Sequence, residues 1–211
     1  MEHVKKKAII FDLDNTIYPV SSIGGRLFRD LFTMIQEDGR FEGSFEEVKE
    51  AIQRKAFQVV AKEFKFHGDL TSAGLEALSD LEYTGQMKPF DDYEVARVIP
   101  LMKFLVTTGF SKLQRSKIRQ LDVEKDFEAC FVVDPAKSKK TKKDIFAEIM
   151  NRYGLTAREV LVVGDDIHSE IQAGKELGLE TVLYDFASKY VELPEYTDHI
   201  ITNFSELERF L

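Results

Sequence analysis

The sequence predicts an α/β protein that has a parallel sheet and a helical segment inserted after the first strand. Apolar runs typical of buried strands lie within residues 8–16, 103–109 and 159–166, and each run ends abruptly in polar residues. From about residue 88 onward, strand-like runs alternate with helical patterns. A parallel sheet requires this alternation, because each strand must return to the same edge through a crossover connection.

The segment from 16 to 87 contains no strong strand signal. Three helical patterns fill it instead, near 24–37, 44–65 and 71–82. The middle pattern opens with Ser44 and Glu47 at the spacing of a capping box, which marks a helix start. We therefore predict a helical domain at 16–87 and an α/β core domain made of residues 1–15 and 88–211.

The first strand ends in two aspartates, Asp12 and Asp14, separated by one residue. Because a strand repeats every two residues, both carboxylates start on the same side of the chain as it leaves the sheet. A simple turn or helix cap would need only one aspartate together with Asn15 and Thr16. The paired like charges therefore indicate a functional site.

Three other segments carry polar groups suited to the same site. They are the Thr107-Thr108-Gly109 turn, the pair Asp165 and Asp166, and the lysine cluster at 137–143. The carboxyl ends of parallel strands open onto one edge of the sheet, and ligands bind at that edge. We expect the hydroxyls, the carboxylates and one lysine to converge there.

In order and spacing, these segments resemble the motifs of the haloacid dehalogenase superfamily of aspartate-dependent phosphohydrolases. The resemblance covers almost the whole chain, and it implies a Rossmann-like parallel core with a helical cap inserted after the first motif. The stretch from Thr16 to Pro19 also looks like the pyrimidine 5′-nucleotidase-like branch.

The resemblance assigns the first two motif positions to catalysis. Asp12 is expected to attack phosphorus, since a carboxylate nucleophile can split the reaction through an aspartyl-phosphate. Asp14 is expected to protonate the leaving alkoxide and then to deprotonate the hydrolytic water, which requires a raised pKa at the start. The Thr107 hydroxyl and the backbone amides of Thr108 and Gly109 are expected to hold phosphoryl oxygens.

The lysine that offsets charge at phosphorus is predicted to be Lys140, with Lys139 and Lys142 as rivals. Counting back from Ile145 by the spacing usual in the superfamily gives Lys140. Glu170 departs from the pattern of the superfamily, whose members commonly have Asp or Asn at this position. We expect Glu170 to orient Lys140 or a metal-bound water, or to be an exposed helix carboxylate.

The site would gather four carboxylates, those of Asp12, Asp14, Asp165 and Asp166. They could not all remain ionised side by side without a counter-charge. All-oxygen ligation with a phosphate favours Mg²⁺. We predict that the metal is held by the side chains of Asp12 and Asp165 and by the backbone carbonyl of Asp14, with Asp166 in support or as a further ligand. The carbonyl is implied by the resemblance.

Composition limits the partners. The chain has 211 residues and a net charge of −8, which disfavours nucleic acid because a phosphate backbone requires a basic surface. No stretch is long and apolar enough to span a bilayer. The single cysteine, Cys130, excludes an intrachain disulfide and fits a reducing cytoplasm. We expect a cytoplasmic monomer or homodimer that binds a small phosphorylated metabolite.

Taken together, these features predict a Mg²⁺-dependent phosphomonoesterase, with a nucleoside monophosphate as the favoured substrate. The alternatives are a sugar-phosphate phosphatase, a β-phosphoglucomutase-like phosphotransferase and a non-catalytic protein that binds a phosphorylated ligand. The nearest candidates for substrate selection are Tyr18, Ser21, Ser22 and Arg26. Of these, Tyr18 could stack on a base or close the pocket.

Overall fold

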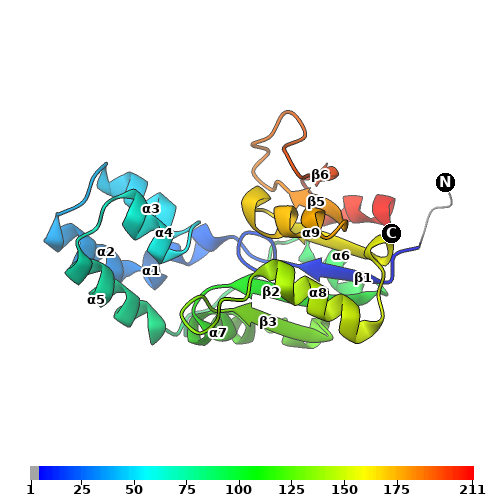
Figure 1. Ribbon diagram of the computed structural model, residues 1–211, viewed down its shortest axis with the longest axis horizontal. Helices are drawn as coiled ribbons and strands as arrows, with labels where there is room; N and C mark the ends of the chain where they lie inside the picture. The colour runs from blue at the N-terminus through cyan, green and yellow to red at the C-terminus, as the bar shows by residue number, and fades with distance from the viewer. Residues whose placement is uncertain (1–4) are drawn as a thin grey trace.

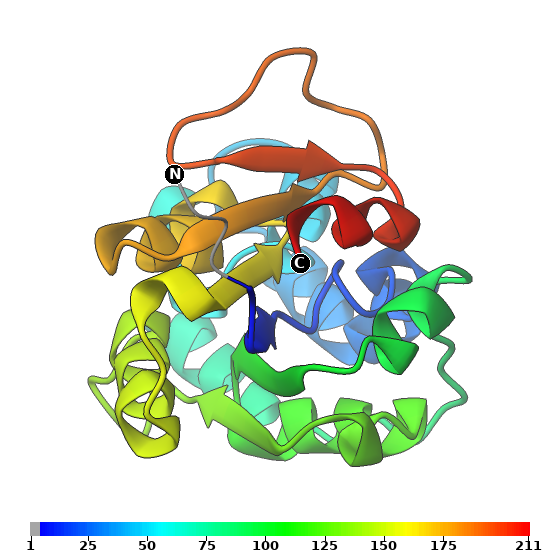
Figure 2. The same ribbon diagram turned by 90° about the vertical axis from the view of Figure 1, so that its right-hand side faces the viewer.

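The structure, a computed structural model, describes residues 5–211; residues 1–4 of the predicted core lie outside the described part. Its centre is a six-stranded sheet in the order β3-β2-β1-β4-β5-β6, in which every neighbouring pair is parallel (Figures 1 and 2). The strands are β1 (Ala8–Phe11), β2 (Met102–Thr108), β3 (Ala129–Val133), β4 (Val160–Gly164), β5 (Glu180–Tyr184) and β6 (His199–Ile201). The predicted α/β class with a parallel sheet is confirmed.

Helices cover both faces of this sheet, as Figure 2 shows. One face is covered by α6 (Tyr93–Val98), α7 (Ser111–Leu121) and the 3₁₀ helix η5 (Phe204–Phe210), and the other by α8 (Lys142–Tyr153) and α9 (Gln172–Glu176). The alternation along β1 explains the two layers: Ile9 and Phe11 belong to the first apolar cluster, and Ala8 and Ile10 belong to the second. A strand buried on both faces is apolar throughout, so β1 has no polar residue before Asp12.

Between β1 and β2 the chain forms a separate group of helices, seen at one end of Figure 1. It consists of α1 (Gly24–Leu27), α2 (Arg29–Asp38), α3 (Phe45–Ile52), α4 (Phe57–Glu63) and α5 (Gly68–Ser79), which we call the helical unit. These helices lie within the segment predicted to be helical. Ser44 caps α3 and forms the expected capping box with Glu47.

The predicted helix at 44–65 is wrong in one respect, because the chain turns at residues 53–56 and divides it into α3 and α4. The break lets Phe57 pack against α5, where a Cβ on Gly74 would come within 2.3 Å of the Phe57 ring. Val59, which the helical pattern assigned to the apolar face, is 52% exposed as a result.

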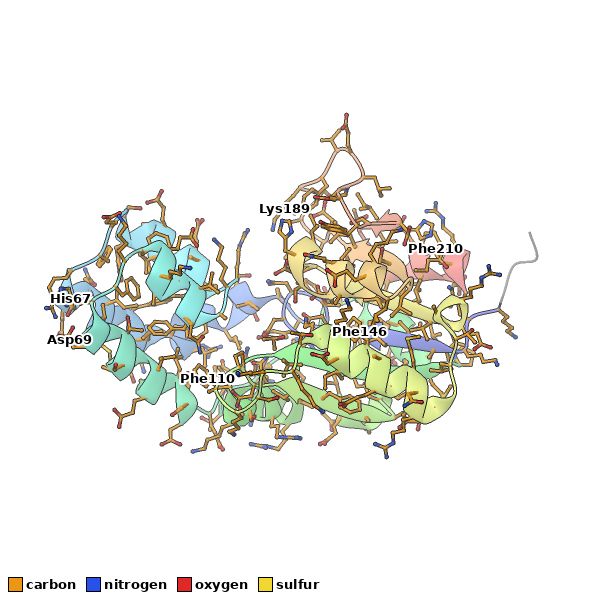
Figure 3. All side chains as sticks on the ribbon, viewed as in Figure 1. His67, Asp69, Phe110, Phe146, Lys189 and Phe210 are labelled. Atoms are coloured by element: carbon orange, nitrogen blue, oxygen red, sulfur yellow. The ribbon has the colours of Figure 1, made fainter. Side chains whose placement is uncertain are left out.

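The carboxyl ends of the strands face the helical unit. In Figure 1 the β1 arrow points toward that unit, and in Figure 3 Phe110 lies at the end of the core that faces it. His67 and Asp69 mark the opposite end of the unit (Figure 3). Two linkers, residues 12–23 and 80–92, join the parts, and they lie side by side where the Phe90 amide donates to the Ile17 carbonyl at 2.9 Å. None of the helices between residues 5 and 211 has the length and apolarity needed to cross a membrane.

Candidate active site

Asp12 lies at the centre of the site, as the first residue after β1. Its backbone amide donates to the Val163 carbonyl at 3.0 Å, which extends the pairing of β1 with β4 by one residue. Asp12 is only 6% exposed. Because β4 is the neighbour of β1, its own end brings Asp165 to the same edge of the sheet. The predicted convergence of these two carboxylates is therefore present.

The lysine beside Asp12 is Lys142, and the prediction of Lys140 does not match the geometry. The Lys142 ammonium contacts an Asp12 carboxylate oxygen at 2.6 Å, and Lys142 is 7% exposed. Lys140 is exposed and pairs instead with Glu148 on the outer side of α8. The physical reason is the start of α8: Thr141 is its N-cap, so Lys142 is the first helical residue and lies at the sheet edge.

Glu170 holds the other side of the Lys142 ammonium. Its carboxylate contacts the Lys142 nitrogen at 2.6 Å and accepts the Asp166 amide at 2.7 Å. A π-helical turn at Ile167–Ile171, η4, returns Glu170 to the end of β4, so close that a Cβ on Gly164 would lie 2.2 Å from it. Glu170 is 1% exposed and orients the lysine. An exposed position for Glu170 is excluded.

Three carboxylates could hold a divalent cation. One oxygen from each of Asp12, Asp165 and Glu170 lies within 4.8 Å of the others. Asp166 is outside this group, since its carboxylate accepts the His168 amide at 2.8 Å and begins the turn that carries Glu170. The three oxygen donors suit Mg²⁺. Glu170 thus joins the acidic group where the sequence analysis had placed Asp166.

The electrostatics of this group favour a cation. Burial, with Glu170 and Asp14 adding to it, raises the pKa of Asp12 to about 7 although the Lys142 ammonium opposes the shift. Burial and the charges of Glu170 and Asp12 raise the pKa of Asp165 well above its usual range. The pKa of Asp166 is raised by burial and by Glu170. One ammonium therefore does not neutralise the cluster, and a bound cation would let these groups ionise.

Asp14 has a different environment, because its carboxylate is turned toward α7. Lys117 contacts its two oxygens at 2.9 and 3.1 Å, and the Gln114 amide donates to one of them at 2.8 Å. The Tyr18 hydroxyl donates to the other oxygen. Burial raises the pKa of Asp14, but the Lys117 charge and these hydrogen bonds outweigh it and hold the pKa below its usual range. The raised pKa expected for this residue is therefore not found in the resting site.

The Thr107-Thr108-Gly109 turn lies at the end of β2, next to β1. Thr107 is 1% exposed, and its hydroxyl accepts a hydrogen bond from the Gln114 amide at 2.6 Å. The Gly109 amide donates to the Val133 carbonyl at 2.9 Å because the pairing of β2 with β3 continues to this residue. That amide is therefore engaged within the sheet, and its contact with a phosphoryl oxygen stays a prediction.

Sequence reasoning missed Gln114 and assigned no role to Lys117. The available signal was their spacing: polar residues at i and i+3 lie on one face of a helix that follows a motif turn. Their burial, 1% and 4% exposed, was not visible in the sequence. The same helix also carries apolar residues, so its inward face could not be assigned from pattern alone.

The residues expected to select substrate are differently placed. Tyr18 is fully buried, and the Ser22 hydroxyl donates to the Pro19 carbonyl at 2.6 Å. Arg26 is exposed and lines a cleft of about 400 Å³ between the two linkers, together with Ser22 and Lys88. Tyr18 therefore contributes a hydrogen bond to Asp14 and not an open aromatic surface.

Comparison with known proteins agrees with this geometry. The family model for haloacid dehalogenase-like hydrolases matches residues 6–178. A glyceraldehyde 3-phosphate phosphatase from Pyrococcus furiosus is 25% identical, over 95% of this chain and 91% of its own. A ribulose-1,5-bisphosphate 5-phosphatase from Halopiger xanaduensis is 22% identical over 84% of each chain. The crystal structure of CbbY from Rhodobacter sphaeroides in complex with phosphate has a TM-score of 0.69 at 18% identity, over 96% of both chains.

The family match spans β1, β2, β4 and the helical unit, and therefore all the site residues described above. The structural likeness extends to the complete fold. The predicted superfamily is confirmed: the chain belongs to the haloacid dehalogenase-like hydrolases.

Proposed function

We propose that the protein is a Mg²⁺-dependent phosphomonoesterase that hydrolyses a small sugar phosphate through an aspartyl-phosphate on Asp12. The observation that carries this proposal is the buried Asp12 carboxylate, which lies 2.6 Å from Lys142 and within a group of three carboxylates. Phosphate monoesters resist nucleophiles by charge repulsion, so their hydrolysis depends on positioning and neutralisation. The site provides a carboxylate, an ammonium and a place for a cation in one buried edge.

Each residue has a distinct part in this proposal. Asp12 attacks phosphorus, and the bond to the leaving oxygen breaks as that oxygen takes a proton from Asp14. Because Asp14 is ionised in the resting site, it first takes this proton from the phosphate monoanion of the bound substrate. Asp14 then takes a proton from the water that attacks the aspartyl-phosphate. The Thr107 hydroxyl donates to a phosphoryl oxygen, and Lys142 offsets the negative charge that gathers there.

The metal would be held by Asp12, Asp165 and Glu170, and the backbone carbonyl of Asp14 remains a predicted fourth ligand. Bound Mg²⁺ would neutralise the phosphoryl group and the surrounding carboxylates. Lys142 keeps Asp12 and Glu170 apart on either side of its ammonium, which maintains the spacing of two of these donors.

A sugar phosphate is preferred to a nucleoside monophosphate for two reasons. The relatives from Pyrococcus furiosus and Halopiger xanaduensis are named as phosphatases of sugar phosphates. Tyr18, the residue expected to stack on a base, is 0% exposed and engaged with Asp14. The pyrimidine nucleotidase-like specificity stays a prediction, as do a cytoplasmic location and a monomeric or homodimeric state.

The test is phosphate release from a panel of compounds with Mg²⁺ and with EDTA, using the wild type and Asp12→Asn in parallel. The panel contains glyceraldehyde 3-phosphate, ribulose 1,5-bisphosphate, several nucleoside monophosphates and hexose 1-phosphates. We expect Mg²⁺-dependent release that is fastest with a sugar phosphate, and loss of release in Asp12→Asn.

Fastest release from a nucleoside monophosphate would restore the nucleotidase alternative. Isomerisation of a hexose 1-phosphate with little release would identify a phosphotransferase. Ligand binding with no release from any compound would contradict an enzymatic function altogether.

A further inference from the structure

One buried amide connects two parts of the site that come from different strands. The Gln114 side-chain nitrogen donates to Thr107 Oγ1 at 2.6 Å and to Asp14 Oδ2 at 2.8 Å, and it lies 3.3 Å from the Thr108 carbonyl oxygen. The Gln114 side chain also lies over Gly109, where a Cβ would come within 3.1 Å of it. Gln114 thus contacts the predicted phosphate-binding hydroxyl and the predicted acid at once.

Lys117 lies one turn further along α7 and contacts both oxygens of the same aspartate. With Gln114 and the Tyr18 hydroxyl it surrounds the Asp14 carboxylate with donors from two elements. These hydrogen bonds occupy both oxygens and fix the rotation of the carboxylate about its Cβ–Cγ bond. A side chain so fully engaged has one orientation in the resting site.

The turn of α7 that carries these residues is itself fixed. The Ser116 hydroxyl donates to the Leu113 carbonyl at 2.7 Å and accepts the Tyr83 amide from the second linker at 2.8 Å. Leu113 and Ile118, on either side of the two polar residues, are buried in the core. A donor on a rigid helix holds its partner more accurately than one on a loop.

Burial of these groups requires a reason beyond stability. Gln114 is 1% exposed and Lys117 is 4% exposed. Buried amides and ammonium groups lose hydration, and apolar side chains of similar volume stabilise a core at least as well. Their partners are Asp14 and Thr107, two of the residues to which the proposed reaction gives a chemical role.

We propose that Gln114 and Lys117 are positioning residues, which hold the Asp14 carboxylate in the orientation needed to protonate the leaving oxygen. Gln114 also fixes the position of this carboxylate relative to the Thr107 hydroxyl, because its amide nitrogen donates to both. This inference rests on the proposed function, because it assigns the two residues to the leaving-group step of phosphoester hydrolysis. Both residues act through the Asp14 carboxylate, and neither is assigned a contact with phosphorus or with the leaving oxygen.

The test compares two substrates that differ in their need for an acid. An alkoxide leaves slowly unless it is protonated, whereas p-nitrophenolate is stable as an anion and leaves without help. The value of kcat/KM reports the steps up to departure of the leaving group. We therefore measure kcat/KM with p-nitrophenyl phosphate and with the sugar phosphate that the wild type hydrolyses fastest, for Gln114→Met and Lys117→Met.

For Gln114→Met we expect the ratio of kcat/KM, sugar phosphate over p-nitrophenyl phosphate, to fall about tenfold below the wild-type ratio, as partial loss of general-acid catalysis requires. For Lys117→Met we expect a smaller fall, because loss of the ammonium also raises the pKa of Asp14. A merely structural role would lower both values together and leave the ratio unchanged. Gln114→Met alters no charge, so it keeps the test valid if Lys117→Met folds poorly. Thermal unfolding of each variant records its folded state.

The matched control is Lys112→Met on the same helix. Lys112 is about half exposed, and among residues 5–211 its ammonium pairs with Asp80 alone, at 3.4 Å, so its ratio should equal that of the wild type. An unchanged ratio in folded Gln114→Met and Lys117→Met would overturn the inference while leaving the proposed function intact. Absence of phosphate release in the wild type would overturn the proposed function and the inference with it.

Discussion

The helical unit and the α/β core differ in where their charged side chains lie. In the described part of the chain, the buried charged side chains all belong to the core or its loops: Lys6, Asp12, Lys117, Asp134, Lys142, Glu170 and Asp185. The buried residues of α1–α5 are apolar or glycine. Charges of the helical unit pair at its surface instead, as Arg40 does with Asp38 and Asp69.

This difference indicates that packing stabilises the helical unit, whereas the buried charges of the core serve the chemistry of the site. The helical unit is held by aromatic packing, with Phe57 and Phe66 at 5.9 Å between ring centres and Phe41 next to Phe66 at 6.2 Å. A buried ionic group adds little stability, because the loss of hydration offsets the attraction. Asp12, Lys142 and Glu170 are therefore better explained by what the site does than by what stabilises the fold.

The largest expected effect belongs to the core. Asp12→Asn keeps the size of the side chain but removes the nucleophilic oxygen charge, so kcat should fall by at least about 1000-fold. Steady-state phosphate release with a sugar phosphate measures it. A variant that retains a tenth of the wild-type rate would show that another group is the nucleophile.

The second prediction distinguishes Lys142 from Lys140, which lies two residues earlier in the chain. Lys142→Met should lower kcat by about 100-fold, since it removes a charge aimed at the phosphoryl group. Lys140→Met is the matched control and should change kcat by less than about twofold, because an exposed ion pair with Glu148 does not reach the site. Equal losses in the two variants would contradict the assignment of Lys142.

A third effect concerns the metal. Glu170→Gln removes one charge from the acidic group and weakens the hold on Lys142, so about tenfold more Mg²⁺ should be needed for half-maximal activity. Titration of EDTA-treated enzyme with Mg²⁺ measures this shift. Unchanged Mg²⁺ activation would mean that Glu170 orients the lysine without contributing to the metal.

The smallest effect is expected in the helical unit. A methyl group at Gly74 would lie 2.3 Å from the Phe57 ring, so Gly74→Ala should destabilise the protein by about 1–2 kcal/mol through overpacking. Urea unfolding measures the change. Gly68→Ala, in the first turn of the same helix with no atom within 4 Å of the added carbon, should change stability by less than about 1 kcal/mol. Similar losses in both variants would contradict the packing argument.

The fold class and the meeting of Asp12 with Asp165 could be predicted because both follow from strand direction. Parallel strands end at one edge, so residues directly after β1 and β4 meet there. The identity of the lysine that contacts Asp12 could not be predicted in this way. Its identity depends on the residue at which α8 begins, and Thr141, as the N-cap, makes Lys142 the first helical residue.

Other features depended on tertiary packing. The break between α3 and α4 accompanies the packing of Phe57 against Gly74, a contact between distant residues that no local pattern contains. The low pKa of Asp14 arises chiefly from the charge of Lys117, which is 103 residues away in the chain, with further hydrogen bonds from Tyr18 and Gln114. The occupied amide of Gly109 follows from one additional pairing with β3.

The central claim is that Asp12 carries the phosphoryl group during turnover, and peptide mapping of acid-quenched enzyme tests it most directly. The wild type is mixed with a sugar phosphate and Mg²⁺, quenched within one turnover, digested and examined by mass spectrometry. We predict a phosphoryl group on Asp12 in the wild type and none in Asp12→Asn. Phosphate release without phosphorylation of Asp12 would contradict the account.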